Sequence, residues 1–198
     1  MSLRTAARRF ALPSSTRAFH TTPRRLIKKG DPLPSLEGVL HESSPGNKVN
    51  LADEASKVNR MIILGVPAAF SPACSAQHIP SFLSHPRTKE FDTLAVISVN
   101  DAFVMKAWGE TLDPAGDLGV RFLADPSGQY TRALDLAFDG SAIFGGDRSK
   151  RYSMIVEDGK VKELYVEPDN TGTSVSLADN VLGKEAGTGN PHFDSGRG

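Results

Sequence analysis

Cysteine is almost absent from this chain, whose 198 residues contain only Cys74. One cysteine excludes an intramolecular disulfide, a CxxC redox pair and a zinc site built from several cysteines. The lack of a disulfide framework is typical of proteins in a reducing compartment. Any oxidised form of Cys74 must therefore be reduced by a thiol that comes from another molecule.

Long hydrophobic runs are lacking as well. No apolar stretch approaches the roughly 20 residues that a membrane-spanning helix needs. No stretch near the N-terminus has the apolar core of a secretory signal peptide either. We therefore expect no membrane partner and no secretion.

Acidic side chains are missing from residues 1–30, which carry eight Lys and Arg side chains. An arginine-rich, serine-containing and acid-free N-terminus that can form a basic amphipathic helix is typical of a mitochondrial transit peptide. The segment Arg17-Ala-Phe-His-Thr-Thr22 resembles mitochondrial processing sites, and a mature chain would begin near Ile27. We predict a transit peptide over residues 1–26 and a location in the mitochondrial matrix. A disordered basic arm that binds nucleic acid is the alternative.

The charge of the remaining chain is acidic. The full sequence balances 23 basic against 23 acidic residues, and residues 31–198 hold 15 of the basic and all 23 of the acidic ones. This excess of negative charge argues against nucleic acid as a partner of the mature protein.

The surroundings of Cys74 point to a reactive thiol. The apolar run Met61–Leu64 ends in a glycine and a proline, as a buried strand does where it enters a loop. Ser71 and Pro72 then form a helix start, with a hydroxyl at the N-cap and proline at the first helical position. Cys74 falls in the first turn, where free N–H groups and the helix dipole favour a thiolate. A small, inert, buried side chain is the alternative.

These residues resemble a known family. Pro67, Ser71 and Cys74 match the Pro-x-x-x-(Thr/Ser)-x-x-Cys signature of peroxiredoxins, and the stretch from Gly65 to Pro80 is similar to the peroxiredoxin-5 subgroup. The resemblance runs in order over residues 27–182. Further matching segments are 45–51, 98–103, 123–126, 150–154 and 166–168.

The resemblance implies a thiol peroxidase that reduces hydrogen peroxide and organic hydroperoxides through a sulfenic acid at Cys74. Ser71 would direct its hydroxyl toward the sulfur and the peroxide, although it could serve only as an N-cap. Pro67 would shape the loop and shield the sulfur, although it could be a simple turn proline. Arg151 occupies the position of the family's catalytic arginine. Without the resemblance, it would be read as a surface charge in the run Arg148-Ser-Lys-Arg151.

Four positions depart from the family pattern, one of them Val96, which replaces a cysteine found in some relatives. Ser71 stands where threonine is commoner, and Ala73 where many members of the subgroup have glycine. Val175 stands where some members carry a second, resolving cysteine, which implies a one-cysteine cycle. Glutathione, assisted by glutaredoxin, is then the favoured reductant and thioredoxin the second, with no prosthetic cofactor and no metal. The resemblance also implies a homodimer.

The pattern of elements predicts an α/β protein with a mixed central β-sheet flanked by helices, and the resemblance specifies a thioredoxin-like fold. The domain covers residues 27–182, and the Gly-rich segment 183–198 is predicted to be a flexible tail. Asp158-Gly159 predicts a hairpin turn, and Pro80 a kink in its helix. The predicted strands are 48–51, 61–66, 94–99, 120–124, 152–157 and 161–166. The predicted helices are 72–83, 102–111, 127–136 and 177–182.

Other function classes stay open at this point. His78 lies four residues after Cys74, and the two could form a Cys–His pair of the thiol-protease kind, although no residue that would orient the histidine is evident. Cys74 could instead act as a sensor that relays oxidation to partner proteins. An inert scaffold of the same fold is the third possibility.

Overall fold

The structure, a computed structural model, describes residues 25–117 and 119–184. The predicted targeting segment 1–26 and the predicted tail 183–198 lie almost wholly outside these ranges. The described chain forms a seven-stranded sheet in the order β2-β1-β5-β4-β3-β8-β9 and a two-stranded sheet of β6 and β7. The strands are β1 (Leu40–Glu42), β2 (Lys48–Val49), β3 (Arg60–Val66), β4 (Thr93–Ser98), β5 (Arg121–Ala124), β6 (Ala137–Phe138), β7 (Arg148–Ser149), β8 (Tyr152–Glu157) and β9 (Lys160–Val166).

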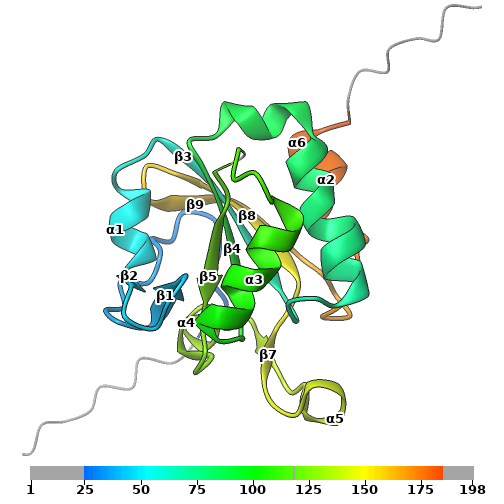
Figure 1. The fold of residues 1–198 in the computed structure, drawn as a ribbon. Coiled ribbons are helices and arrows are strands. Elements are labelled where there is room, and N and C mark those ends of the chain that lie inside the picture. Colours follow the sequence, from blue (N-terminus) through cyan, green and yellow to red (C-terminus); the bar gives the residue numbers. More distant parts are fainter. Residues whose placement is uncertain (1–24, 118, 185–198) are drawn as a thin grey trace, which may run out of the picture.

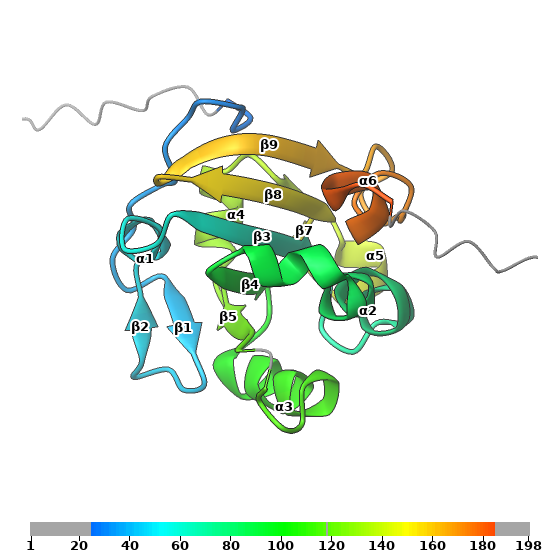
Figure 2. The ribbon, with the colours of Figure 1, turned by 90° about the horizontal axis from the view of Figure 1, so that it is seen from above.

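Helices flank the large sheet (Figure 1). Helices α2 and α6 lie side by side in both ribbon views, and the loop that carries β7 and α5 projects at the lower end of Figure 1 (Figures 1 and 2). The helical segments are α1 (Leu51–Ala55), η1 (Cys74–His78), α2 (Ile79–Ser84), η2 (Pro86–Glu90), α3 (Ala102–Leu112), α4 (Gln129–Ala133), α5 (Ser141–Phe144) and α6 (Ala178–Leu182).

The large sheet is mixed, as predicted. Strand β3 pairs in parallel with β4, which pairs in parallel with β5. On its other side β3 pairs antiparallel with β8, which forms a hairpin with β9. Asp158 and Gly159 at the hairpin turn have φ angles of 49° and 72°, both in the left-handed region that a type I′ turn requires. The predicted hairpin is therefore confirmed.

The core has two layers because successive side chains of a strand point to opposite faces. Met61 and Ile63 of β3 pack in the layer that includes residues of α1 and α4. Ile62, Leu64 and Val66 of the same strand pack against residues of α2, α3 and α6, in the layer that also holds Cys74. The cysteine therefore belongs to the face of the sheet that three helices cover.

Two predicted elements are wrong in extent. The strand predicted over 48–51 ends at Val49, because the side chain of Asn50 accepts a hydrogen bond from the N–H of Ala52 and Leu51 begins α1. The helix predicted over 127–136 is reduced to α4, because Gly128 and Asp135 on either side of it both have left-handed φ angles. The remaining predicted strands and helices are present with small shifts of their ends. The sequence pattern does not predict strands β1, β6 and β7, helices α1 and α5, or the 3-10 helix η2.

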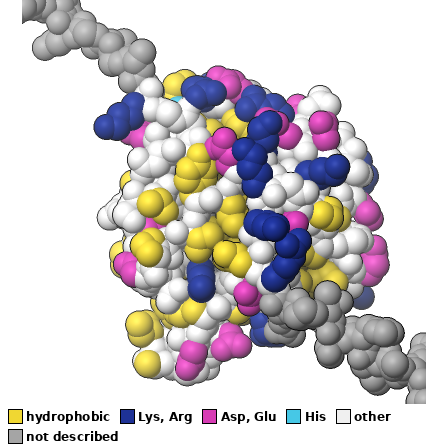
Figure 3. All heavy atoms as spheres, turned by 180° about the vertical axis from the view of Figure 1, so that it is seen from behind, with side chains coloured by type: hydrophobic (Ala, Val, Ile, Leu, Met, Phe, Trp, Pro, Cys, Tyr) yellow, Lys and Arg dark blue, Asp and Glu magenta, His cyan; other side chains and the backbone are white. Residues whose placement is uncertain are grey.

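Neither the described helices nor the surface shown in Figure 3 presents a long apolar region. No described helix combines the length and the apolar composition that crossing a membrane requires. On the face opposite to that of Figure 1, basic and acidic side chains are interspersed with hydrophobic ones (Figure 3).

Candidate active site

The sheet brings the two ends of the predicted site together. Cys74 follows the carboxyl end of β3, and Arg151 immediately precedes β8. Because β3 and β8 are antiparallel neighbours, with Gly65 opposite Tyr152, these two ends meet at the same edge of the sheet. A Cβ atom on Gly65 would lie 1.9 Å from the Tyr152 ring, so the strand needs glycine where it enters the loop to Cys74.

Cys74 is fully buried and lies between two polar groups. The Ser71 hydroxyl is 2.7 Å from the Cys74 sulfur, and Nη1 of Arg151 is 3.3 Å from it. The Ser71 carbonyl accepts from the N–H of Ser75 at 2.9 Å, as expected at a helix start. The Ser71 hydroxyl itself is directed to the sulfur, the first of the two roles considered for it.

The turn that carries the cysteine is a π-helix over Cys74–His78, and the N–H of Ile79 bonds the Cys74 carbonyl. The helix continues through Pro80 in α2. A π-turn inside an α-helix is uncommon and often occurs at a functional site. The ring N–H of Trp108 in α3 donates to the Ser75 hydroxyl at 3.1 Å, which ties this turn to the neighbouring helix.

Arg151 is buried, with 1% of its surface exposed, so its interpretation as a surface charge is wrong. Its guanidinium donates to backbone carbonyls of the segment after β9. Nε bonds the Gly172 carbonyl at 2.7 Å, and Nη2 bonds the Thr171 carbonyl at 3.0 Å. These bonds leave Nη1 facing the sulfur of Cys74. The positive charge is therefore held in a fixed orientation beside the thiol.

His78 completes this arrangement from the same helical turn. Its Nε2 lies 2.9 Å from the Ser153 hydroxyl, which donates its own hydrogen to the Ser176 carbonyl at 2.6 Å. Nε2 therefore carries the ring proton, and Nδ1 accepts from Nη1 of Arg151 at 3.4 Å. Burial, together with the nearby Arg151 charge, lowers the pKa of His78 to about 3. The ring is neutral and both nitrogens are engaged, which leaves no base for a protease-like Cys–His pair.

Comparison with known proteins identifies the family. The Redoxin family model matches residues 28–182. Peroxisomal membrane associated protein 20 of Schizosaccharomyces pombe is 38% identical over 160 residues, which cover 79% of this chain and 98% of that protein. The structure of peroxiredoxin 5 from Alvinella pompejana is 39% identical, with a TM-score of 0.64 over 73% of this chain and 92% of that one. The chain is a peroxiredoxin of the peroxiredoxin-5 subgroup.

A third relative of this peroxiredoxin is Peroxiredoxin-2F, mitochondrial, of Arabidopsis thaliana. It is 39% identical over 131 residues, which cover 65% of this chain and 64% of that protein. Membership of the family makes the protein a thiol peroxidase, and the predicted thioredoxin-like fold is confirmed. No group of three His, Cys, Asp or Glu side chains able to hold a metal ion occurs among the residues described.

The loop before Cys74 is tied to the neighbouring strand of the peroxiredoxin sheet. Pro67 is buried in this loop. The Asn100 side-chain oxygen, just after β4, accepts from the N–H of Ala69 at 3.0 Å and from the Ser98 hydroxyl at 2.7 Å. Phe70 has a φ of 61° and is half exposed, and its ring centroid lies 6.4 Å from that of Trp108. Asn100 therefore supports the loop. The sequence indicates no such role for it, because Asn100 appears only as part of the segment 98–103 that matches the family.

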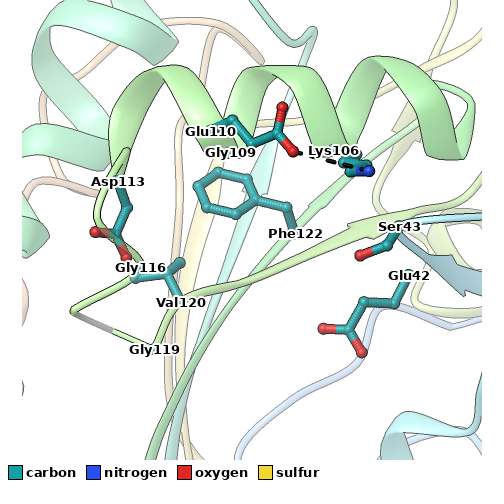
Figure 4. Close-up of a pocket in the computed structure, with 10 residues that line it drawn as sticks. All are labelled: Glu42, Ser43, Lys106, Gly109, Glu110, Asp113, Gly116, Gly119, Val120 and Phe122. Atoms are coloured by element: carbon teal, nitrogen blue, oxygen red, sulfur yellow. Dashed lines mark ion pairs between the residues drawn. The ribbon is translucent and has the colours of Figure 1, made fainter.

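A hollow of about 220 Å³ elsewhere in the peroxiredoxin lies beside α3 (Figure 4). Lys106 and Glu110, one turn apart on α3, form an ion pair of 3.8 Å along one side of this hollow, and the Phe122 ring lies beneath the helix. None of the four predicted site residues lines this hollow. This hollow is therefore separate from the place where Cys74 and Arg151 meet.

Proposed function

We propose that Cys74 is the peroxidatic cysteine of this peroxiredoxin. The supporting observation is the position of its sulfur, 2.7 Å from the Ser71 hydroxyl and 3.3 Å from Nη1 of Arg151. The Cys74 thiolate attacks the terminal oxygen of a hydroperoxide, an S–O bond forms and the O–O bond breaks. The sulfur is oxidised by two electrons to a sulfenic acid that keeps the terminal OH of the peroxide. The other oxygen departs as hydroxide or alkoxide and takes up one proton, equivalent to the one the Cys74 thiol released on ionising, to give water or an alcohol.

Each neighbour has a distinct role in this proposal. Arg151 stabilises the thiolate and the negative charge that develops on the leaving oxygen, since a preorganised cation acts strongly in a buried site. Ser71 orients the peroxide through its hydroxyl. Pro67 keeps the loop in place and limits the access of water to the sulfur.

The hydroxyl of Ser71 gives the first prediction. Ser71→Ala should slow the reaction with hydrogen peroxide, because a donor beside the sulfur is lost. Ser71→Thr should react at close to the rate of the natural protein, because it keeps the hydroxyl. Stopped-flow measurement of the second-order rate constants tests both variants. Equal rates for the alanine and threonine variants would remove Ser71 from the proposal.

We further propose that glutathione, assisted by glutaredoxin, completes the cycle. Val175 stands at the position of the resolving cysteine and is about one-third exposed, so no second thiol of this chain can react there. One glutathione condenses with the Cys74 sulfenic acid and releases water, and a second thiol then displaces the reduced cysteine and leaves with the glutathione as a disulfide. Cys74 is buried, which favours a small thiol over a protein thiol as the first partner.

Mass spectrometry tests this second step. After one equivalent of hydrogen peroxide plus glutathione, a single glutathione adduct on Cys74 is the expected product, and glutaredoxin should remove it. A Cys74–Cys74 dimer that thioredoxin reduces efficiently would contradict the glutathione assignment. Stable mixed disulfides with other proteins, formed faster than the glutathione adduct, would instead favour the sensor function.

Residues 1–26 are proposed to target the chain to the mitochondrial matrix. The composition of the segment supports this location, and so does the mitochondrial relative, whereas the S. pombe relative is named for peroxisomes. Fusion of residues 1–26 to a fluorescent reporter should give a mitochondrial signal and a shortened product. A matched fusion with the Arg side chains changed to Gln should stay in the cytosol. Peroxisomal or nuclear fluorescence of the natural segment would contradict the proposal.

The remaining organisation is part of the same proposal. Residues 27–182 form the catalytic domain, and 183–198 form a tail. The working form is a non-covalent homodimer, since a disulfide through Cys74 would block the reaction. The exposed rings of Phe70 and Phe103 support self-association, because large apolar side chains on a surface favour contact with another protein.

A further inference from the structure

Glu167 is a buried carboxylate with no role in the reaction described so far. It follows the last residue of β9 and is 1% exposed. One oxygen accepts from the N–H groups of Val175 and Ser176, both at 2.8 Å, and from the Ser176 hydroxyl at 2.7 Å. The other oxygen accepts from the Ser174 hydroxyl at 2.7 Å. The carboxylate therefore closes the segment 168–176 into a loop.

This loop supplies the groups that hold Arg151. Its Thr171 and Gly172 carbonyls accept from the guanidinium. The backbone makes two more bonds, from the N–H of Arg151 to the Asn170 carbonyl at 2.7 Å and from the N–H of Glu167 to the Arg151 carbonyl at 3.0 Å. The loop therefore binds both the backbone and the guanidinium of Arg151.

The far end of the loop reaches Arg151 by a second route. The carbonyl of Ser176 accepts from Ser153, and the Ser153 hydroxyl in turn accepts from His78. His78 presents Nδ1 to Nη1 of Arg151, the same nitrogen that faces the sulfur. Glu167 binds Ser176 through both its N–H and its hydroxyl, so it fixes the residue from which this route begins.

We propose that Glu167 is a positioning residue that acts through Arg151. By holding the loop closed, it places the carbonyls that bind Nε and Nη2 and the serine that orients His78, and so directs Nη1 at the Cys74 sulfur. The inference rests on the proposed roles of Cys74 and Arg151. Its donors are neutral loop groups, which distinguishes this arrangement from an ion pair with the arginine.

The charge state of Glu167 agrees with this role. Burial raises the pKa of the carboxyl group, but hydrogen bonds from Ser176, Ser174 and Val175 outweigh burial and lower the pKa to about 2. The group is therefore ionised throughout the neutral range, where both of its oxygens act as acceptors for the loop.

A double-mutant cycle with Arg151 tests the proposal. Glu167→Ala should lower the second-order rate constant for hydrogen peroxide by up to about 100-fold, the scale of a displacement near 1 Å in a catalytic group. In the Arg151→Ala background the same change should have little further effect, because the group that it positions is gone. Glu167→Gln should restore most of the rate, because its side-chain oxygen can still accept from Val175 and Ser176.

Asp125 provides the matched control. It is also a buried carboxylate, and it accepts from the N–H groups of Tyr130 and Thr131 and from the Thr131 hydroxyl at the start of α4. Asp125→Ala should lower the midpoint of thermal unfolding without changing the peroxide rate. A purely structural role for Glu167 predicts the same behaviour for Glu167→Ala.

The outcomes separate the inference from the function on which it rests. The inference would be overturned if Glu167→Ala reacted with hydrogen peroxide at the rate of the natural protein. It would also be overturned if Glu167→Ala lowered the rate constant by the same factor with and without Arg151. Either result would leave the peroxidase proposal standing. A rate for Arg151→Ala equal to that of the natural protein would overturn both the inference and the role assigned to Arg151, whereas the peroxidase proposal itself depends on the result for Cys74→Ser. If Glu167→Ala does not fold, Glu167→Asp, which keeps the charge and draws the carboxylate back from its donors, replaces it in the cycle with the same criteria.

Discussion

Cys74→Ser should abolish peroxide consumption while the fold is retained. The substitution changes one sulfur to oxygen in a buried first turn, so the packing against α2 and α3 changes little. A serine hydroxyl is not ionised at neutral pH and is a poor nucleophile toward peroxide, even beside Arg151. The measurement is peroxide consumption with glutathione and glutaredoxin present.

Two observations guard this prediction. Circular dichroism and the fluorescence emission of Trp108, the only tryptophan, should match those of the natural protein. Trp108 reports on this site because its ring N–H donates to the hydroxyl of Ser75, the residue after Cys74. Residual turnover at more than a few per cent of the natural rate would show that Cys74 is not the peroxidatic residue.

Arg151→Ala is expected to slow the peroxide step on the order of 100- to 1,000-fold, the usual cost of losing one preorganised donor at developing charge. The substitution also leaves the Thr171 and Gly172 carbonyls and Nδ1 of His78 without their donor. Arg151→Lys should recover only part of the rate, since a lysine cannot reproduce the planar set of donors. Stopped-flow kinetics with hydrogen peroxide gives the rate constants.

Arg148 is the matched control for this second prediction. It lies three residues earlier, and its guanidinium donates to the carbonyls of Val99 and Phe144. Arg148→Ala should therefore affect the loop around α5 and leave the peroxide rate unchanged. If Arg148→Ala reacts slowly with hydrogen peroxide and Arg151→Ala reacts at the rate of the natural protein, the catalytic role has been assigned to the wrong arginine.

The part of the site that follows β3 could be predicted from local sequence. An apolar strand, a loop with Pro67, and the Ser71-Pro72 helix start place Cys74 within a short stretch of chain, and local rules govern each of these steps. Strands with strong apolar runs, such as β3 and β4, were predicted for the same reason. Short elements such as β1 and β7 carry too few residues to show a periodic pattern.

The second half of the site depends on contacts between distant residues. The run Arg148-Ser-Lys-Arg151 gives no sign that one arginine is buried, because the carbonyls that bind it come from residues 171 and 172. The four-residue spacing of Cys74 and His78 suggests that the two side chains interact. In the structure, the His78 ring instead bonds Ser153 in β8 and Arg151 just before it. Glu167 lies in the segment 166–168 that matches the family, but the sequence gives it no role. Its donors, Ser174 to Ser176, lie in an irregular loop that has no periodic pattern to indicate the contact.

The separation of Cys74 and Arg151 by 77 residues also has a consequence for folding. The two side chains meet only after β8 has paired with β3, a contact between distant parts of the chain that requires a large loop to close. Contacts of this kind slow folding and form late compared with local helices. In refolding from denaturant, helical circular dichroism should therefore return before peroxide reactivity, and the recovery of reactivity should follow the slowest folding phase.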